Sequence, residues 1–379
     1  MNKTSAKKSD YIKINRKNAN DLLNFLGKIF TKENIIDRQK RVLYENTYVF
    51  FPLSDKLGKK NEVLNKIANN FKFEIIEKEE KKKSKYKYKT IEDALRNTLP
   101  EEIINLAPKS YDIVGKIAII EFDHINQLNF VESDKIKREI AKAVIEVNKS
   151  VNSVYEKKSE IKGNFRLREL NLLFGEDSSE TLYKENNCSF KLDIKKTYFT
   201  PRLVYERRRI SSLDIKKGEL IIDLFAGVGP ISVQIAKNHD VRIYSFDMNP
   251  YAYKYLVENI KINKLRGKIY PFNINVRKLI EPSNKLGIEL KSKVDRIIMN
   301  LPEKSNKYID IACFLLKQNT GVLHFYKFCE KPNSIKNALI NLEVKLKEIH
   351  LSINKILGSR IVKAFSPKLD LVVVDLTIK

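Results

Sequence analysis

The chain has 379 residues, 42% of them hydrophobic, which is enough for more than one domain with a buried core. Its 72 Lys and Arg residues outnumber its 47 Asp and Glu residues, and the formal net charge of +25 favours a polyanionic partner, above all nucleic acid. A biased genome composition, rich in Lys, Asn and Ile, would produce the same excess, so charge alone names no substrate.

The sequence also argues against several other classes of protein. It has no run of about 18 apolar residues and its first ten residues lack the apolar core of a signal peptide, so we expect a cytoplasmic protein with no membrane partner. The three cysteines, Cys188, Cys313 and Cys329, are too scattered for a disulfide framework or a metal-ligand spacing. The four histidines are equally dispersed, and we expect no metal site.

The first part of the chain predicts a small α+β domain over residues 1–76, after a basic tail at residues 3–8. Hydrophobic spacing predicts helices and strands in the order helix 18–30, strands within 42–51 around the turn 45–47, helix 62–70 and strand 71–76. Residues 77–90 are predicted to be a basic linker or exposed loop, because their charges show no periodicity.

Residues 91–200 are predicted to form an α+β middle domain, because their sequence pattern differs from that of residues 1–76. A helix is expected after Leu99-Pro100, followed by a turn and a central strand within 111–122. An amphipathic helix over 136–147, a strand over 151–155 and an alternating segment over 188–193 complete the expected elements.

Residues 201–379 show a β-α-β rhythm. Strands are predicted at 220–224, 241–246, 268–272, 296–300 and 321–325, helices at 231–238, 251–263, 307–316 and 334–342, and a final hairpin from 361–365 and 371–378. This alternation predicts a Rossmann-like α/β domain, a mostly parallel sheet with helices on both faces and an antiparallel end. Ligands of such sheets bind beyond the carboxyl ends of the strands.

The first of these strands ends in the turn Ala226-Gly227-Val228-Gly229. Glycines allow the backbone to turn tightly and to approach a ligand, and the helix that follows offers free N–H groups. Asp247 follows about 20 residues later, after the second strand, and can hold a ribose diol. Glycine turns also occur without any ligand, and the G-x-G-x-x-G fingerprint of nicotinamide enzymes is absent.

The motif Asn300-Leu301-Pro302 ends the fourth strand. There an amide and the adjacent carbonyl groups can face the planar edge of an amine or amide, while the proline fixes the loop. Such turns also end strands for purely structural reasons. Combined with the glycine turn and with Asp247-Met248-Asn249-Pro250, the motif indicates a methyltransferase that uses S-adenosylmethionine.

Several further motifs, in the same order, resemble the archaeal and eukaryotic tRNA (guanine-N1)-methyltransferase family, which modifies the guanosine at position 37, on the 3′ side of the anticodon. The resemblance covers residues 11–379. It rests on the motifs already named and on Leu99-Pro100, Tyr111-Asp112-Ile113-Val114-Gly115, Asn164-Phe165-Arg166-Leu167-Arg168-Glu169-Leu170, Tyr198-Phe199-Thr200-Pro201-Arg202-Leu203, Glu206-Arg207, and Arg360-Ile361-Val362-Lys363 with Pro367.

The resemblance implies an N-terminal domain that senses tRNA shape, a middle domain that contributes to the tRNA and active sites, and a methyltransferase domain that forms 1-methylguanosine. Guanine N1 carries a proton, so methylation requires a general base and a group that stabilises negative charge on O6. By resemblance Glu206 is the base and Arg166 stabilises O6, with Arg168 as its possible replacement, while Asn300 and Pro302 hold the guanine edge. Without the resemblance, Glu206 beside three arginines would equally be a surface ion pair.

The resemblance also implies the binding residues. The predicted cofactor residues are Tyr198, Asp223, Phe225, Gly227, Gly229, Asp247, Asn249 and Asn275, and the predicted substrate residues are Arg168, Arg202 and Arg207. Asn275 stands where the family commonly has an acid, and an amide oxygen accepts a hydrogen bond without charge assistance. The partner is tRNA, through its anticodon loop and tertiary core, with the target base extruded. No protein partner is implied, and a monomer is expected.

Basic stretches at 81–89, 157–168, 202–209 and 355–368 are available for phosphate contacts, and Tyr86-Lys87-Tyr88 could stack on RNA or form a solubilising loop. The alternatives are an enzyme that transfers the aminocarboxypropyl group of the same cofactor to a wyosine precursor, a methyltransferase acting on a tricyclic guanine derivative, and a non-catalytic RNA-binding protein. The segment 198–202 together with Glu206 favours methyl transfer.

Overall fold

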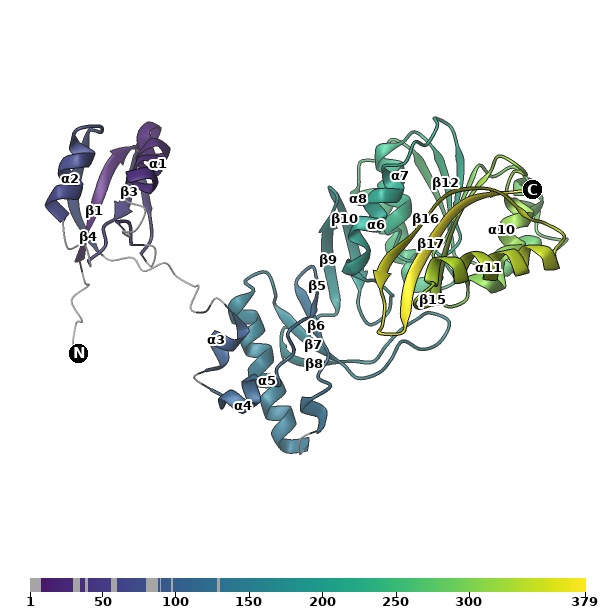
Figure 1. The fold of residues 1–379 in the computed structure, drawn as a ribbon, viewed down its shortest axis with the longest axis horizontal. Helices are drawn as coiled ribbons and strands as arrows, with labels where there is room; N and C mark the ends of the chain where they lie inside the picture. Colours follow the sequence, from purple (N-terminus) through teal and green to yellow (C-terminus); the bar gives the residue numbers. More distant parts are fainter. Residues whose placement is uncertain are drawn as a thin grey trace. The chain divides into compact units, whose positions relative to one another are not determined.

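The computed structural model describes residues 8–29, 35–37, 40–55, 60–79, 88, 90–96, 98–127 and 130–379. The chain divides into two compact units, residues 1–94 and residues 95–379, each with its own sheet structure (Figure 1). Residues 3–7 of the predicted basic tail and most of the predicted linker, including Tyr86 and Lys87, lie outside the described residues. None of the described helices is both long and apolar enough to cross a membrane.

The first unit is a four-stranded antiparallel sheet in the order β2-β3-β1-β4 with two helices. Its elements are β1 (Lys8–Asn15), α1 (Ala19–Ile29), β2 (Leu43–Glu45), β3 (Tyr48–Pro52), α2 (Lys60–Ala68) and β4 (Phe73–Glu79). The sequence did not predict β1, because charged residues interrupt its apolar pattern. Pairing with β3 on one side and β4 on the other places it at the centre, where Ile12 and Ile14 are buried against Leu22 of α1.

The second unit begins with a smaller four-stranded sheet in the order β5-β6-β7-β8. Its elements are α3 (Ile91–Leu95), which crosses the boundary between the units, α4 (Glu101–Ile104), β5 (Asp112–Val114), β6 (Ile117–Ile120), α5 (Phe130–Val147), β7 (Ser153–Lys157) and β8 (Leu170–Gly175). The turn and single strand expected within 111–122 form a hairpin. Gly115 adopts a positive φ of 61° at its turn, and a Cβ there would lie 2.2 Å from Thr181 Oγ1.

A two-stranded hairpin, β9 (Glu180–Glu185) and β10 (Cys188–Asp193), packs on helix α8 (Pro250–Ile262). The side chain of Asn259 accepts a hydrogen bond from Lys191 N at 2.7 Å and donates to Lys191 O at 3.0 Å. Asn263 makes the same pair of contacts with the backbone of Ser189. The expected domain boundary at residue 200 therefore falls after a hairpin that already packs on the last domain.

The last domain is a seven-stranded sheet in the order β13-β12-β11-β14-β15-β17-β16. Its strands are β11 (Leu220–Asp223), β12 (Arg242–Phe246), β13 (Lys268–Phe272), β14 (Arg296–Met299), β15 (Val322–Glu330), β16 (Ile353–Ala364) and β17 (Leu369–Ile378). The first five strands in this order are parallel, while β17 runs antiparallel to β15 and β16 antiparallel to β17. The predicted Rossmann-like fold with an antiparallel end is confirmed.

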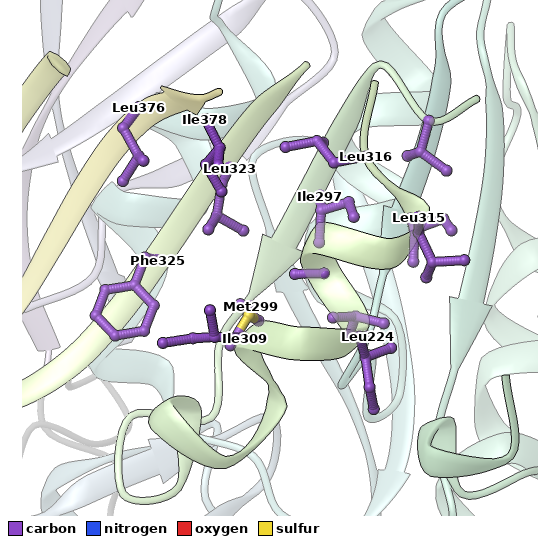
Figure 2. Close-up of a cluster of buried hydrophobic side chains, with 14 of the residues drawn as sticks. Leu224, Ile297, Met299, Ile309, Leu315, Leu316, Leu323, Phe325, Leu376 and Ile378 are labelled. Atoms are coloured by element: carbon purple, nitrogen blue, oxygen red, sulfur yellow. The ribbon is translucent and has the colours of Figure 1, made fainter. Parts of the chain in front are cut away.

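Helices cover both faces of this sheet, because alternate strand residues are apolar on each side. The helices are α6 (Val204–Ser211), α7 (Pro230–Asn238), α8, α9 (Lys285–Leu290), α10 (Ile309–Leu315) and α11 (Ser334–Glu348). Ile222 of β11 belongs to the core under α9, α10 and α11, whereas its neighbour Ile221 packs with residues of α6, α7 and β10. Figure 2 shows the first of these cores, where Ile309 of α10 lies beside Met299 of β14.

Two helices of this domain, α6 and α9, were not predicted, and β16 begins eight residues earlier than expected, at Ile353 rather than 361. The segment that forms α6 is a charge run, which predicts a solvated surface. In the structure Glu206 and Arg207 of α6 are both buried. The charge pattern was misleading because Tyr326 of β15 and Arg360 of β16 contact Glu206, and Glu185 of β9 pairs with Arg207, so elements distant in the chain bury both residues.

Candidate active site

One cleft lies at the carboxyl ends of β11, β12 and β14, where ligands of parallel sheets bind. Eleven of the fifteen predicted site residues line it, namely Arg166, Tyr198, Arg207, Asp223, Phe225, Gly227, Asp247, Asn249, Asn275, Asn300 and Pro302. The other four, Glu206, Gly229, Arg168 and Arg202, do not. The cleft thus brings together segments from the middle and last parts of the chain.

The glycine turn joins β11 to α7 as the sequence predicted. Gly229 is the N-cap of α7 with a φ of 87°, and a Cβ there would lie 2.4 Å from Leu256 Cδ1. Gly227 has a φ of 56° but faces open space, since the only atom near its virtual Cβ is Tyr198 O at 3.9 Å. Gly229 is therefore required for packing, and Gly227 leaves room on the side of the cleft.

Asp247 fixes the next loop. Its Oδ2 accepts a hydrogen bond from Gly227 N at 2.8 Å, and its Oδ1 accepts one from Asn249 N at 2.8 Å. Each carboxylate oxygen keeps a second lone pair, and Asp247 lines the cleft. Burial raises the pKa of Asp247 in spite of these two donors. A hydroxyl pair that donates to Asp247 would relieve this cost of burial.

Asn249 has both ends of its amide engaged within the protein. Its Oδ1 accepts from Tyr251 N at 3.0 Å as the N-cap of α8, and its Nδ2 donates to Lys196 O at 2.8 Å. Asn275 is likewise an N-cap, accepting from Arg277 N at 3.0 Å before the short helix η4 (Val276–Ile280). These two residues shape the wall of the cleft through the backbone that they hold.

Asp223 is the buried acid at the end of β11. Its Oδ2 accepts from Ser232 Oγ at 2.8 Å, and Ser232 Oγ accepts in turn from Ser245 Oγ at 2.8 Å. Its Oδ1 is buried without a hydrogen-bond partner among the residues that the structure describes. Burial is the main reason that the pKa of Asp223 is raised to about 7. A buried acceptor that lacks a donor in the wall of a cleft fits a ligand that supplies one.

Two aromatic rings in the lining of the cleft contact each other. Phe225 and Tyr308 have ring centres 5.0 Å apart in an edge-to-face arrangement, and both line the cleft. Rings of this kind bind planar groups such as an adenine base. Together with Asp223 and Asp247, they make this half suited to a nucleoside that carries a cationic substituent.

The other half of the cleft centres on Arg166. Its guanidinium lies 4.0 Å from the ring centre of Tyr198, and its Nη2 donates to Glu303 Oε1 at 3.1 Å. Arg166 has a φ of 56°, and its Nε is buried with no hydrogen-bond partner in the described part of the chain. Asn300 and Pro302 also line the cleft here, at the end of β14. The arrangement presents donors from Arg166 to a ligand atom that accepts.

Glu206, the predicted base, is not exposed to this cleft. It is 3% exposed, and Arg209 and Tyr326 donate to its Oε1 at 2.8 and 2.5 Å. Its Oε2 accepts from Arg209 Nε at 3.2 Å and pairs with the Arg360 guanidinium. The structure therefore places Glu206 in a buried ion cluster, whereas Leu203 and Arg207, close to it in sequence, line the cleft.

Arg207 differs most from its expected substrate contact. It is 3% exposed, and its Nε and Nη2 donate to the two carboxylate oxygens of Glu185 at 2.5 and 2.6 Å. Its Nη1 donates to Thr200 O at 3.1 Å. A guanidinium that is held on three sides serves the structure of the cleft wall. Arg202, by contrast, is exposed and donates from Nε to Asp112 Oδ1 at 2.6 Å.

The sequence analysis missed three charged residues in the cleft, Glu303, Lys304 and Lys363. Glu303 directly follows Asn300-Leu301-Pro302, so its position next to the strand end was the available signal. Lys363 belongs to the motif Arg360-Ile361-Val362-Lys363, for which the resemblance implied no role in the site. Burial, followed by Arg202, lowers the pKa of Lys363. Among the described residues, no group of three or more His, Cys, Asp or Glu side chains is placed to hold a metal ion.

Comparison with known proteins gives two family matches. Residues 181–354 match the TRM5/TYW2 methyltransferase domain, and residues 91–178 match the TYW2 N-terminal domain. The tRNA (guanine(37)-N(1))-methyltransferase Trm5b of Methanocaldococcus jannaschii is 32% identical over 371 residues, covering 97% of this chain and 98% of that protein.

Two solved structures extend this likeness to the whole fold. The complex of aTrm5 and tRNALeu has a TM-score of 0.67 and 31% identity, covering 97% of this chain and 98% of that one. The structure of Methanocaldococcus jannaschii Trm5 in complex with adenosine has a TM-score of 0.59 and 29% identity, covering 97% and 99%. The chain therefore belongs to the TRM5/TYW2 methyltransferase family.

Proposed function

We propose that this protein is a tRNA (guanine(37)-N(1))-methyltransferase that uses S-adenosylmethionine. The observation that carries the proposal is the single cleft that holds both the Asp223 and Asp247 half and the Arg166 and Asn300 half. The first half suits a nucleoside cofactor, and the second suits the edge of a guanine. Relatives that match nearly the whole chain bear this activity in their names.

The cofactor half supplies three kinds of contact. Asp247 accepts from the ribose hydroxyls, the free Oδ1 of Asp223 accepts from the methionine ammonium, and Phe225 lies beside the adenine. Asn249 and Asn275 act as positioning residues, because their amides hold backbone turns. Bound here, S-adenosylmethionine supplies a methyl group that its sulfonium already activates, so the protein's main task is alignment.

The substrate half removes one proton and stabilises one charge. The N1 proton of guanine passes to the carboxylate of Glu206, and the N1 electron pair forms a bond to the methyl carbon as the carbon–sulfur bond breaks. Arg166 donates to O6, where negative charge develops as the proton leaves. Asn300 and the carbonyl groups around Pro302 hold the amide edge of the base. The Glu206 proton is then lost to solvent.

This role requires a change at Glu206, because both of its oxygens are occupied in the described arrangement. Its most accessible partner is Arg360 of the edge strand β16, whose side chain is 43% exposed. An RNA phosphate can compete for this guanidinium. Departure of Arg360 would leave Glu206 Oε2 with Arg209 Nε, at 3.2 Å, as its donor, and with a second lone pair for the extruded guanine.

Positive groups around the cleft are assigned to the RNA backbone. Lys363 and Arg202 contact phosphates near the target nucleotide, and Arg168 is a further candidate. Residues 1–76 sense the tRNA core, residues 91–200 contribute to tRNA binding, and residues 201–379 carry the methyltransferase site. A monomer that acts on tRNA in the cytoplasm completes the proposal.

The identity of the product tests the reaction. Unmodified tRNA transcript is incubated with S-adenosylmethionine, digested to nucleosides and examined by mass spectrometry. We expect 1-methylguanosine from position 37 and no product from a transcript with adenosine at that position. A larger adduct would indicate aminocarboxypropyl transfer, the activity to be excluded in a family that includes TYW2. An unchanged transcript would contradict an enzymatic role.

The base is tested separately by Glu206→Gln. The amide keeps the size of the side chain but cannot take up the N1 proton, so the single-turnover rate should fall by about 10²- to 10⁴-fold. Cofactor affinity should change little, because Glu206 does not line the cleft. An unchanged single-turnover rate would remove Glu206 from the mechanism while leaving the identity of the product untouched.

A further inference from the structure

A chain of polar contacts connects Glu206 to the interior of the sheet, on the face that α6 covers. Arg209 Nη2 donates to Glu206 Oε1 at 2.8 Å, and Arg209 Nη1 donates to Asp375 Oδ2 at 2.6 Å. Asp375 Oδ1 lies 2.6 Å from His324 Nδ1, and His324 Nε2 lies 2.9 Å from Arg296 Nη1. These contacts join α6 to β17, β15 and β14.

The donors in this chain fix the protonation state of His324. Arginine only donates, so its contact with Arg296 makes His324 Nε2 an acceptor. The neutral ring then carries its proton on Nδ1 and donates it to Asp375. Burial lowers the pKa of His324, which favours the same neutral form.

Asp375 is correspondingly ionised. Burial alone would raise the pKa of Asp375, but hydrogen bonds from His324 and Arg209 outweigh it and lower the pKa to about 2. The carboxylate thus carries a full negative charge and faces the Arg209 guanidinium. Asp375 comes from β17, 166 positions along the chain from Arg209, so it is not a helical neighbour that adapts together with α6.

Arg209 is consequently shared between two carboxylates. Its Nε and Nη2 face Glu206, while its Nη1 faces Asp375. We infer that Asp375, oriented by His324, is a positioning residue for methyl transfer: it draws the Arg209 guanidinium toward β17, which aims Glu206 and preserves its strength as a base. A base that is oriented by a further group through a hydrogen-bonded partner follows the general logic of catalytic triads.

The other groups that contact Glu206 supply no negative charge that could offset Arg209 as Asp375 does. Tyr326 of β15 donates to Glu206 as a neutral hydroxyl, and Arg360 of β16 adds a second positive charge. Glu219 pairs with Arg296 at 3.1 Å at the far end of the chain of contacts. The cluster contains three carboxylates and three guanidinium groups, so neutralising Asp375 leaves Arg209 with Glu206 as its only carboxylate partner.

Asp375→Asn tests the inference, which rests on Glu206 being the base. In the full-length enzyme, at saturating tRNA and S-adenosylmethionine, we expect the single-turnover rate to fall at least about tenfold. KM for tRNA and the Kd of the cofactor should change little, because Asp375 does not line the cleft. The acid limb of the pH–rate profile should move to lower pH, since Glu206 beside an unshared arginine holds a proton less tightly.

Asp370→Asn is the matched control, because Asp370 is a buried carboxylate of the same strand. Its partners are Ser334 and Lys331, away from Glu206. It should leave the single-turnover rate and its pH profile unchanged. If Asp375→Asn does not fold, Arg209→Lys tests the same link between Asp375 and Glu206. A lysine keeps the charge but loses the planar guanidinium that contacts both carboxylates.

A lowered melting temperature with an unchanged rate and pH profile, in whichever of these two variants folds, would overturn the inference and make the cluster purely structural. The comparison with Glu206→Gln separates this failure from that of the proposed base. If Glu206→Gln is slow and Asp375→Asn is normal, only the positioning role is wrong. If Glu206→Gln is itself normal, the base assignment fails first.

Discussion

The guanidinium of Arg166 is held between the ring of Tyr198, 4.0 Å from its centre, and the carboxylate of Glu303, 3.1 Å from Nη2. A cation over an aromatic face that also pairs with a carboxylate has little rotational freedom. The donors of Arg166 are therefore oriented before any ligand enters. This is the property that stabilisation of a developing negative charge requires, because an oriented donor needs no reorganisation during the reaction.

Arg166→Lys should therefore slow the chemical step. Lysine keeps the charge but not the planar fork, so it cannot face Tyr198, Glu303 and a guanine O6 together. Removal of one donor to a developing oxyanion costs about 10²- to 10³-fold in rate, and we expect a loss of this size in single-turnover methylation. The affinity for tRNA should change much less, as measured by filter binding.

Arg168→Lys is the comparison for this prediction. Arg168 belongs to the same motif but does not line the cleft, so its substitution should affect tRNA affinity more than the chemical rate. The reverse pattern, in which Arg168→Lys slows chemistry and Arg166→Lys does not, would exchange the two assignments.

Arg207→Met should lower the free energy of unfolding rather than the affinity for RNA. It leaves the buried carboxylate of Glu185 without its bidentate, charged partner, although Gln234 Nε2 still donates to it at 2.7 Å. Breaking a buried ion pair from one side costs about 3–5 kcal/mol of unfolding free energy. Urea denaturation followed by circular dichroism measures this loss.

A double variant, Arg207→Met with Glu185→Leu, is the control, because replacing both members of a buried pair with apolar groups is often neutral. It should recover most of the lost stability. A stable Arg207→Met enzyme that binds tRNA weakly would instead support the substrate contact that the sequence suggested.

The two glycines of the cofactor turn should respond differently to alanine. Gly229→Ala combines a left-handed backbone with a contact of 2.4 Å to Leu256 and should cost about 2–4 kcal/mol of unfolding free energy. Gly227→Ala meets nothing closer than 3.9 Å and should cost only about 1–2 kcal/mol, from the backbone alone.

Cofactor titration completes this comparison. The new methyl group of Gly227→Ala enters the cleft, so S-adenosylmethionine should bind more weakly than the small loss of stability explains. Equal destabilisation of the two variants, or an unchanged Kd in Gly227→Ala, would contradict the distinction between a packing glycine and a ligand-facing glycine.

The parts of the fold that sequence could predict are those whose signal is local. The apolar strand before Gly227, the turn itself and the helix from Pro230 follow one another in the chain and were predicted together. Strand β1 was missed because its burial depends on β3 and β4, which pair with it from both sides. No pattern within residues 8–15 reveals that pairing.

The same limit applies to the site. Asp247, Asn275 and Asn300 could be predicted to share a site because strand ends of a parallel sheet converge at one edge, whereas Arg166 and Tyr198 were predicted only through the family resemblance. The surroundings of Glu206 could not, because Tyr326, Arg360 and Asp375 come from distant strands. A weak signal existed in His324 and Asp375, each a polar residue within an apolar run, at 322–326 and 371–376. The pairing of Arg207 with Glu185 was likewise not predicted, because Glu185 lies on β9, outside the charge run.

Cofactor affinity should depend on pH through Asp223. Burial raises the pKa of Asp223 from 3.8 to about 7, so in the free enzyme the group is protonated below about pH 7. The cofactor's ammonium binds best to the ionised form, so affinity should rise with pH up to about 7 and then level off. Each pH unit below that value should weaken binding by up to about tenfold, as measured by calorimetry.

Stability has the opposite dependence on pH, because the folded state holds a proton between pH 3.8 and about 7 that the unfolded state has lost. The contribution of Asp223 to stability is therefore greatest at low pH and is lost as the pH rises through about 7. Asp223→Asn should make both the cofactor affinity and the stability less dependent on pH. Adenosine, which lacks the ammonium group, is the control ligand, and its Kd should rise far less as the pH falls. A parallel dependence for adenosine would show that Asp247 or another group titrates instead.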